Sequence, residues 1–362
     1  MKKNLPPTAY PLPPKKCIRP DYVKDFKCDG KLCGCRCCRD WQIVLDDDAY
    51  KKFSELSDLD REEILRNVDW KRDKTLGVDV MTLKLDADGL CKFLTADGLC
   101  SIQKRHGENF LTAICQSYPR VTYKLSDEIF EQSMTLTCPV AAQMILLCEE
   151  PIKFVEVDEV KTRAIIGVKI SRNVEDFVKL QMDAIKILQD RNFSINRRLK
   201  KFYEKLGGNF ASDVEFNLKS HALTLIDIFN KMYDANLNER KKDALLKSFL
   251  CFREIILGEV HKNFDDVLEN YLVNEFFMRC YPQAFVGGDI INAKIFVASY
   301  KLLEFAITLS VIAKNKFNEE DLTDLIVSVN DMLDHSHGGM DAIINFVKSC
   351  DEKKFASTML EN

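Results

Sequence analysis

The sequence has little net charge and no apolar N-terminal segment, and each of these absences excludes a class of protein. Its 362 residues carry a formal net charge of −4, which is too small for a basic surface that would bind nucleic acid. The N-terminus has lysines but no apolar core of the kind that a secretion signal needs. We therefore expect an ordinary globular protein in the cytoplasm, and the sequence leaves its oligomeric state open.

No stretch of the sequence qualifies as a membrane span. The most hydrophobic long stretch, residues 291–313, is interrupted by Lys294, Lys301 and Glu304, whereas a spanning helix needs about 20 predominantly apolar residues. The stretch predicts a buried amphipathic helix. Nothing in the sequence requires a membrane, and peripheral association stays open.

Three motifs that bind cofactors are also absent. The sequence has neither a GxGxxG loop for a dinucleotide nor a GxxxxGK[ST] loop for phosphates. It also lacks the CxxxCxxC spacing of radical enzymes that bind S-adenosylmethionine on a unique iron. If the chain uses that cofactor, the binding site must have another architecture.

Cysteine, by contrast, is abundant. There are fourteen cysteines, and ten of them fall between Cys28 and Cys148. A chain of this length without a secretion signal does not need disulfides. Dense cysteines at short spacing in a reducing compartment are more typical of metal ligands or redox groups. The sequence therefore predicts a thiolate-ligated metal centre.

Composition divides the chain into three zones. Residues 1–27 form a proline-rich arm, residues 28–150 contain the clustered cysteines and short strand-like segments, and residues 151–362 show helical periodicity. We expect a mainly α protein, in which a small cysteine-rich domain with short strands precedes a bundle of about six to eight helices. The clearest amphipathic helices are predicted at 173–190, 243–260, 264–281, 291–313 and 319–333.

Eight cysteines are the candidate ligands, and they form two clusters. Four thiolates complete a zinc or an iron–sulfur site, so eight could form two sites, or one site with four thiols left over. Spacing does not separate zinc from iron. Adjacent side chains usually diverge, so one cysteine of the pair 37–38 is expected to serve a second centre or to be structural. The candidates are Cys28, Cys33, Cys37 and Cys38, with Cys35 as an additional one, and Cys91, Cys100, Cys115 and Cys138.

The second cluster contains a short internal repeat, because Ala-Asp-Gly-Leu-Cys occurs at 87–91 and again at 96–100. Asp-Gly favours a tight turn, since glycine tolerates positive φ. Each turn would deliver a cysteine just after a bend, where backbone amides can stabilise a thiolate. The segment between the turns is long enough for one short strand. The alternative is a hairpin whose two cysteines have no role.

Other notable residues have simpler structural interpretations. We expect Trp41 to pack in the core, the aspartates at 46–48 to cap a helix, and His106, His335 and His337 to lie at helix ends. The remaining cysteines are predicted to be buried as small apolar residues. They are Cys17, Cys148, Cys251, Cys280 and Cys350.

These motifs resemble those of the flagellin lysine-N-methylase family. The stretch 28–41 has that family's opening cysteine, its CxxxCC group (Cys33, Cys37 and Cys38) and its tryptophan, while Cys35 is an addition to the pattern. The second cysteine cluster, with the Tyr-Pro-Arg of 118–120, matches the second half of the family motif. Residues 17–150 are also similar to cysteine-cluster domains that chelate zinc or iron.

The resemblance implies S-adenosylmethionine-dependent transfer of methyl groups to surface lysines of flagellin in the bacterial cytosol. It also implies an oxygen-sensitive four-iron–four-sulfur (4Fe-4S) cluster held by the clustered cysteines. A non-catalytic zinc- or iron-binding protein with a helical adaptor domain is the alternative.

Lysine methylation has to overcome protonation, because the amine has a pKa of about 10.4 and roughly one molecule in a thousand is nucleophilic at neutral pH. A polar enzyme would desolvate the lysine and supply a base. A cluster-assisted enzyme would supply an electron or anchor the cofactor on an open iron, and we favour this scheme because it explains the iron. Tyr118 and Arg120 are the candidate cofactor-binding residues, since Arg120 could bind a carboxylate bidentately. The alternative is a surface arginine after a proline turn, and no catalytic residue is identified.

Overall fold

The computed structural model describes residues 16–30, 33–39, 41, 43–73, 78–158, 160, 162–209, 214–283, 287–314, 317–335 and 338–361. His337 and residues 1–15 of the predicted arm lie outside the described residues. The chain folds into two compact units, and the prediction of a mainly α protein with a small strand-containing N-terminal part is confirmed. The first unit comprises Met1–Arg19, Val23–Met134 and Val155–Gly167, and the second comprises Pro20–Tyr22, Thr135–Phe154 and Val168–Asn362.

One part of the first unit is a five-stranded sheet with the strand order β6-β1-β5-β4-β7. All residues of this sheet except Pro20 and Phe154 belong to the first unit. Strands β1 and β5 run parallel, with Cys17 opposite Phe130. Strands β4 and β5 form an antiparallel hairpin, and β7 runs parallel to β4. The strands are β1 (Lys16–Pro20), β4 (Arg120–Lys124), β5 (Ile129–Met134), β6 (Phe154–Val157) and β7 (Ile166–Gly167).

The cysteines of the first unit lie among short helices around a two-stranded hairpin. The hairpin packs with the helices around a core that includes Phe53, Ile64 and Leu83. The predicted cap is confirmed, because the Asp46 carboxylate accepts a hydrogen bond of 3.1 Å from the Ala49 amide. The elements are η2 (Arg36–Cys38), α1 (Asp47–Ser54), α2 (Asp58–Arg66), β2 (Val68–Asp73), β3 (Val78–Leu83), α3 (Ser101–His106), η3 (Glu108–Phe110) and α4 (Ala113–Ser117). A further short helix, η1 (Asp21–Lys24), is divided between the two units.

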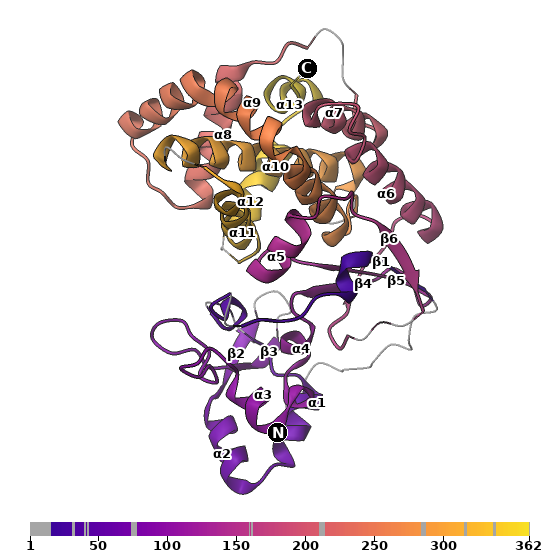
Figure 1. Ribbon diagram of the computed structural model, residues 1–362, viewed down its shortest axis with the longest axis vertical. Helices are drawn as coiled ribbons and strands as arrows, with labels where there is room; N and C mark the ends of the chain where they lie inside the picture. The colour runs from indigo at the N-terminus through magenta and orange to yellow at the C-terminus, as the bar shows by residue number, and fades with distance from the viewer. Residues whose placement is uncertain are drawn as a thin grey trace. The chain divides into compact units, whose positions relative to one another are not determined.

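The second unit is helical and is organised around α10, which contacts α7, α8, α9, α11, α12 and α13 (Figure 1). Among the described residues, α10 is long and apolar enough to cross a membrane by composition, yet 78% of its most apolar window is buried in the structure. Burial in the bundle accounts for that composition. The helices are α5 (Pro139–Leu146), α6 (Val174–Leu188), α7 (Ile195–Lys205), α8 (Leu218–Met232), α9 (Glu239–Met278), α10 (Gly288–Lys314), α11 (Glu319–His335), α12 (Gly339–Lys348) and α13 (Glu352–Met359).

The predicted helices are found, with one difference. Helices α6, α10 and α11 coincide with predicted segments, and the described part of 151–362 contains eight helices, within the expected range. The two helices predicted at 243–260 and 264–281 are joined in α9, in which Phe264 alone leaves helical geometry, with φ −135° and ψ 23°. A single non-helical residue changes the apolar periodicity of the sequence very little. The sequence therefore does not distinguish two separate helices from one kinked helix.

Candidate metal centre

The first cysteine cluster lies on a tightly bent loop. Gly34 and Cys35 both have positive φ, of 59° and 56°, a conformation that side chains other than glycine rarely adopt. The Cys35 amide donates to the Gly30 carbonyl at 3.1 Å, and the Cys38 amide donates to the Cys35 carbonyl at 2.8 Å. This reversal of the chain makes the loop compact and leads directly into η2. The cysteines of the loop are therefore held close together.

The repeated Asp-Gly segments form two equivalent turns. Gly89 and Gly98 have φ of 75° and 76°, which explains why both turns need glycine. The Asp86 carboxylate closes the first turn by accepting from the amides of Asp88 and Leu90, each at 2.9 Å. Isolated bridges, 85 with 91 and 94 with 100, take the place of the predicted short strand.

The cysteines that follow these turns face backbone amides, as predicted. The Phe93 amide lowers the pKa of Cys91, and the amides of Ile102 and Gln103 lower that of Cys100. Burial is the larger effect, so the pKa of Cys91 is still raised to about 11 and that of Cys100 is also raised. Amides directed at sulfur would stabilise a thiolate once a cation is bound.

The two cysteine clusters are joined through the backbone. The Cys91 amide donates to the Cys38 carbonyl at 2.8 Å, and the Cys35 thiol donates to the Gly98 carbonyl. A Cβ atom at Gly30 would lie 3.2 Å from the Gly98 oxygen. Glycine at position 30 therefore allows the first loop to approach the second turn closely.

Cys37 interacts electrostatically with five other described thiols. Its side chain is hydrogen-bonded to that of Cys38, which lowers the pKa of Cys37 to about 7 and raises that of Cys38. These two adjacent side chains do not diverge, contrary to expectation. Burial raises the pKa of the other thiols, and the charge of a Cys37 thiolate raises it further. These thiols belong to Cys28, Cys35, Cys91, Cys100 and Cys115.

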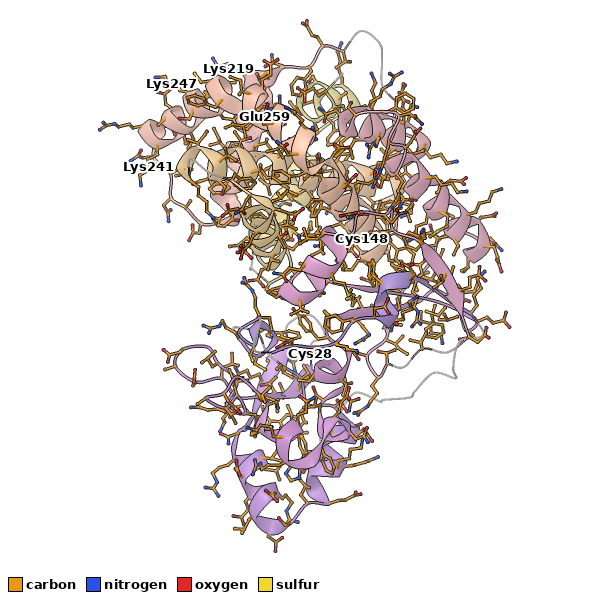
Figure 2. The ribbon with its side chains drawn as sticks, viewed as in Figure 1. Cys28, Cys148, Lys219, Lys241, Lys247 and Glu259 are labelled. Carbon is orange, nitrogen blue, oxygen red and sulfur yellow. The ribbon has the colours of Figure 1, made fainter. Side chains whose placement is uncertain are left out.

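Seven of the eight predicted ligands, together with Cys35, are thus in the first unit, and Cys138 is in the second, where it precedes α5 as its N-cap. Cys38, Cys91, Cys100 and Cys115 pack against the core of the first unit, whereas Cys28 is exposed (Figure 2). Among the described residues, no three cysteine, histidine or carboxylate side chains converge on one position for a metal ion. The donor set nevertheless fits a thiolate-bound group, because it supplies more than four thiols, one of lowered pKa and two facing amides.

Tyr118 and Arg120 lie next to the first cysteine loop. The rings of Tyr118 and Trp41 are 5.9 Å apart, and the Trp41 indole donates to the Cys37 carbonyl. Arg120 donates to the Phe26 carbonyl at 3.2 Å, and its guanidinium lies 5.0 Å from the centre of the Phe26 ring. Its charge lowers the pKa of Cys28 against the larger effect of burial. Arg120 is therefore a half-buried cation beside the thiols, and Trp41 packs against the core as predicted.

The structure places the remaining candidates at helix ends or in the core, or corrects the prediction. His106 ends α3, as predicted, and its Nε2 lies 3.8 Å from an Asp60 oxygen. His335 ends α11. Cys148 and Cys251 were expected to be buried and are exposed, because the helical periodicity of α9 points Cys251 away from the bundle. Cys17, Cys280 and Cys350 are buried as predicted.

Sequence analysis missed a buried ionic network in the helical unit. Glu304 is 1% exposed and is held by Lys301 at 2.7 Å and by His261 at 3.3 Å. Glu269, which is fully buried, binds Arg198 at 2.8 Å. The available signal was the presence of charged residues such as Lys301 and Glu304 within apolar helices, because burying a charge is costly unless it is paired.

Comparison with known proteins places these features in a family. Residues 202–359 match the FliB lysine N-methylase C-terminal domain. Over 130 residues, 35% of this chain, the sequence is 32% identical to the flagellar biosynthetic protein FliU of Salmonella muenchen and covers 75% of it. The lysine-N-methylases of Salmonella typhimurium and Salmonella choleraesuis are also 32% identical over 130 residues, which are 31% of each. No solved structure matches.

A thiol-rich unit and a helical unit that matches a lysine N-methylase domain define the class of protein. The chain belongs to the flagellin lysine-N-methylase family. The matched segment spans about a third of the two lysine-N-methylases named above.

Proposed function

We propose that the chain is a cytoplasmic protein-lysine N-methyltransferase that acts on flagellin, uses S-adenosylmethionine and depends on an iron–sulfur cluster. The observation that carries the proposal is that seven candidate cysteine ligands, Cys37 among them, belong to one unit of a chain whose other unit matches a lysine N-methylase domain. The thiols alone would not favour this activity, since thiols also hold zinc.

The cluster would be held by thiolates from the first cysteine loop and the two Asp-Gly turns. When bound, it would supply an electron or an open iron site for the amino and carboxyl groups of the cofactor. The hydrogen bond from Cys38 lowers the pKa of Cys37 to about 7, which favours its thiolate form. Cys91 and Cys100 offer sulfurs already directed at amides, which reduces the rearrangement needed on binding.

Arg120 is the residue best placed to bind a carboxylate beside these thiols. Its guanidinium is half-buried and charged, and it has only a carbonyl and an aromatic ring as described neighbours that accept from it. The methyl group would pass from the sulfonium sulfur to the lysine nitrogen as the N–C bond forms and the S–C bond breaks, and the amine would give up its proton. A general base would accept this proton.

Two measurements test the proposal separately. Protein purified without oxygen should be brown and contain iron and acid-labile sulfide. The same preparation, incubated with flagellin, S-adenosylmethionine and a reductant, should add methyl groups to flagellin lysines, detected by mass spectrometry. Colourless protein with stoichiometric zinc would favour the non-catalytic alternative. Iron-loaded protein that adds no methyl group would contradict the methyltransferase activity alone.

A further inference from the structure

Helix α4, which carries Cys115, is too short to be stable on its own. It has five residues, whereas isolated helices shorter than about 12–15 residues are marginal in water. The Thr112 hydroxyl caps its start by accepting a hydrogen bond of 3.2 Å from the Cys115 amide. The orientation of α4, and with it the place of the Cys115 thiol, therefore depends on contacts with other segments of the first unit.

The Asp46 carboxylate joins the start of α4 to the start of α1. One of its oxygens accepts from the Ala49 amide at 3.1 Å and from the Arg163 guanidinium at 3.0 Å. The other oxygen accepts from the Ala113 amide at 2.6 Å. The ion pair is largely buried, because only 13% of the Asp46 side chain and 16% of the Arg163 side chain are exposed. The contacts with Ala113 and Arg163 go beyond what capping α1 requires.

A segment that comes later in the sequence holds α4 at both ends. Arg163 donates to the Leu111 carbonyl, just before α4, at 3.1 Å. At the other end, the Ser117 hydroxyl lies 3.0 Å from the Thr162 hydroxyl and accepts from the Ala164 amide at 3.3 Å. Thr162 follows Ser117 by 45 positions, so these contacts belong to the tertiary fold. We call Thr162, Arg163 and Ala164 the α4 clasp.

We propose that Asp46 and the α4 clasp are positioning residues for the candidate metal centre, because they hold Cys115 where its thiolate can bind the metal. Cys91 is part of the core of the first unit, and Cys100 and Cys115 pack against it. A shift of α4 would therefore move one sulfur relative to the others. Groups that orient metal ligands without touching the metal change metal affinity by about 10–100-fold when they are replaced. The inference rests on the proposed function through its metal centre alone.

Chelator-induced bleaching of the brown, anaerobically purified chain tests the proposal. Asp46→Ala and Arg163→Gln should each lose colour about tenfold faster than the unaltered chain. Ser57→Ala is the matched control and should bleach at the unaltered rate, because it removes the cap of α2, a helix of the same unit that carries no cysteine. An Asp46→Ala chain that bleaches no faster than Ser57→Ala would overturn the proposal.

A double-mutant cycle separates positioning from general stabilisation of the unit. Cys115→Ser removes the sulfur that Asp46 positions, so adding Asp46→Ala to it should accelerate bleaching little further. Ser57→Ala serves as the control in the same background. If Asp46→Ala were as damaging in the Cys115→Ser chain as in the unaltered chain, Asp46 would act on the unit as a whole, and the proposal would be wrong.

The cap of α4 offers a conservative pair of variants. Thr112 is 2% exposed, and its hydroxyl accepts from the Cys115 amide. Thr112→Ser keeps the hydroxyl and should bleach at nearly the unaltered rate, whereas Thr112→Val keeps the shape, loses the cap and should bleach faster. Equal rates for the two variants would count against the positioning of Cys115 through α4.

Failure of the proposed function is distinguishable from failure of the positioning role. A chain that holds zinc would contradict the iron–sulfur enzyme, and zinc release to a coloured chelator would then compare the same variants. Faster bleaching of Asp46→Ala in a chain that transfers no methyl group would support the positioning role and contradict the activity alone. A chain that binds neither metal would overturn the positioning role.

Discussion

The backbone amide of Cys91 donates a hydrogen bond to the carbonyl of Cys38 at 2.8 Å. This contact joins two segments that are distant in the sequence and that each contribute thiols to the candidate metal centre. It also places Cys91 and Cys38 on the same part of the core. The candidate ligands are therefore assembled by the fold of the first unit rather than by one local motif.

Replacing a thiol of this assembly should remove metal. We expect Cys37→Ser to lose most of its iron and sulfide, because the charge of Cys37 acts on thiols of both clusters and its own pKa is lowered to about 7. Cys251→Ser is the control, since Cys251 is exposed on α9. Metal analysis after anaerobic purification distinguishes them, and equal iron in both variants would exclude Cys37 as a ligand. Cys138→Ser in the same series tests the predicted ligand of the second unit.

The second Asp-Gly turn should be sensitive to a methyl group. Gly98→Ala would force a side chain into φ 76° and place its Cβ 3.4 Å from the Cys35 sulfur, so we expect a loss of about 1–2 kcal/mol in the free energy of unfolding. Gly258→Ala meets open space in α9 and should instead stabilise by about 0.5–1 kcal/mol. Urea unfolding measures the change in unfolding free energy of both variants. A Gly98→Ala variant as stable as the unaltered chain would show that the turn tolerates alanine.

The buried charge of Glu304 should matter far more than an exposed one. Glu304→Gln would leave the buried Lys301 and His261 without their shared carboxylate, at a cost of about 3 kcal/mol in unfolding free energy. Asp227→Asn, which breaks the exposed pair with Lys231, should cost less than about 1 kcal/mol. Chemical denaturation compares the unfolding free energies of the two variants. Similar losses in both would mean that the buried network contributes little to stability.

Two histidines should make stability depend on pH in opposite directions. Burial would lower the pKa of His261, but hydrogen bonds with Asp265 and Glu304 raise it to about 9. The contribution of His261 to the free energy of unfolding is complete below its unfolded pKa of about 6.5. This contribution is lost as the pH rises through 9. Burial and the charges of Lys301 and Arg253 lower the pKa of His221 to about 4, so its contribution is present above about pH 6.5 and is lost as pH falls towards 4.

Unfolding free energies at pH 5, 7 and 9 test this assignment. His261→Gln should flatten the decline above pH 7, whereas His221→Gln should flatten the decline below it. His335→Gln, at the exposed end of α11, controls for the substitution itself. An unaltered alkaline limb in His261→Gln would show that Asp265 and Glu304 do not raise its pKa in the folded chain.

Local patterns were sufficient for most helices and for the two Asp-Gly turns. Apolar periodicity located α6 and α11, and the Asp-Gly repeat located both turns, because these features depend on neighbours in the sequence. The contacts Cys91–Cys38 and His261–Glu304 join distant segments, so no local pattern could predict them. Cys251 was misjudged because its exposure depends on which side of α9 meets the bundle.

The break at Phe264 gives the two halves of α9 different environments. Every residue from Val267 to Met278 is buried, whereas the first half is open on one side. Helical amides exchange with solvent only when their segment opens, and peripheral segments open at lower free energy than core ones. Hydrogen exchange should therefore find a step in protection near residue 264, so that one helix belongs to two cooperative units.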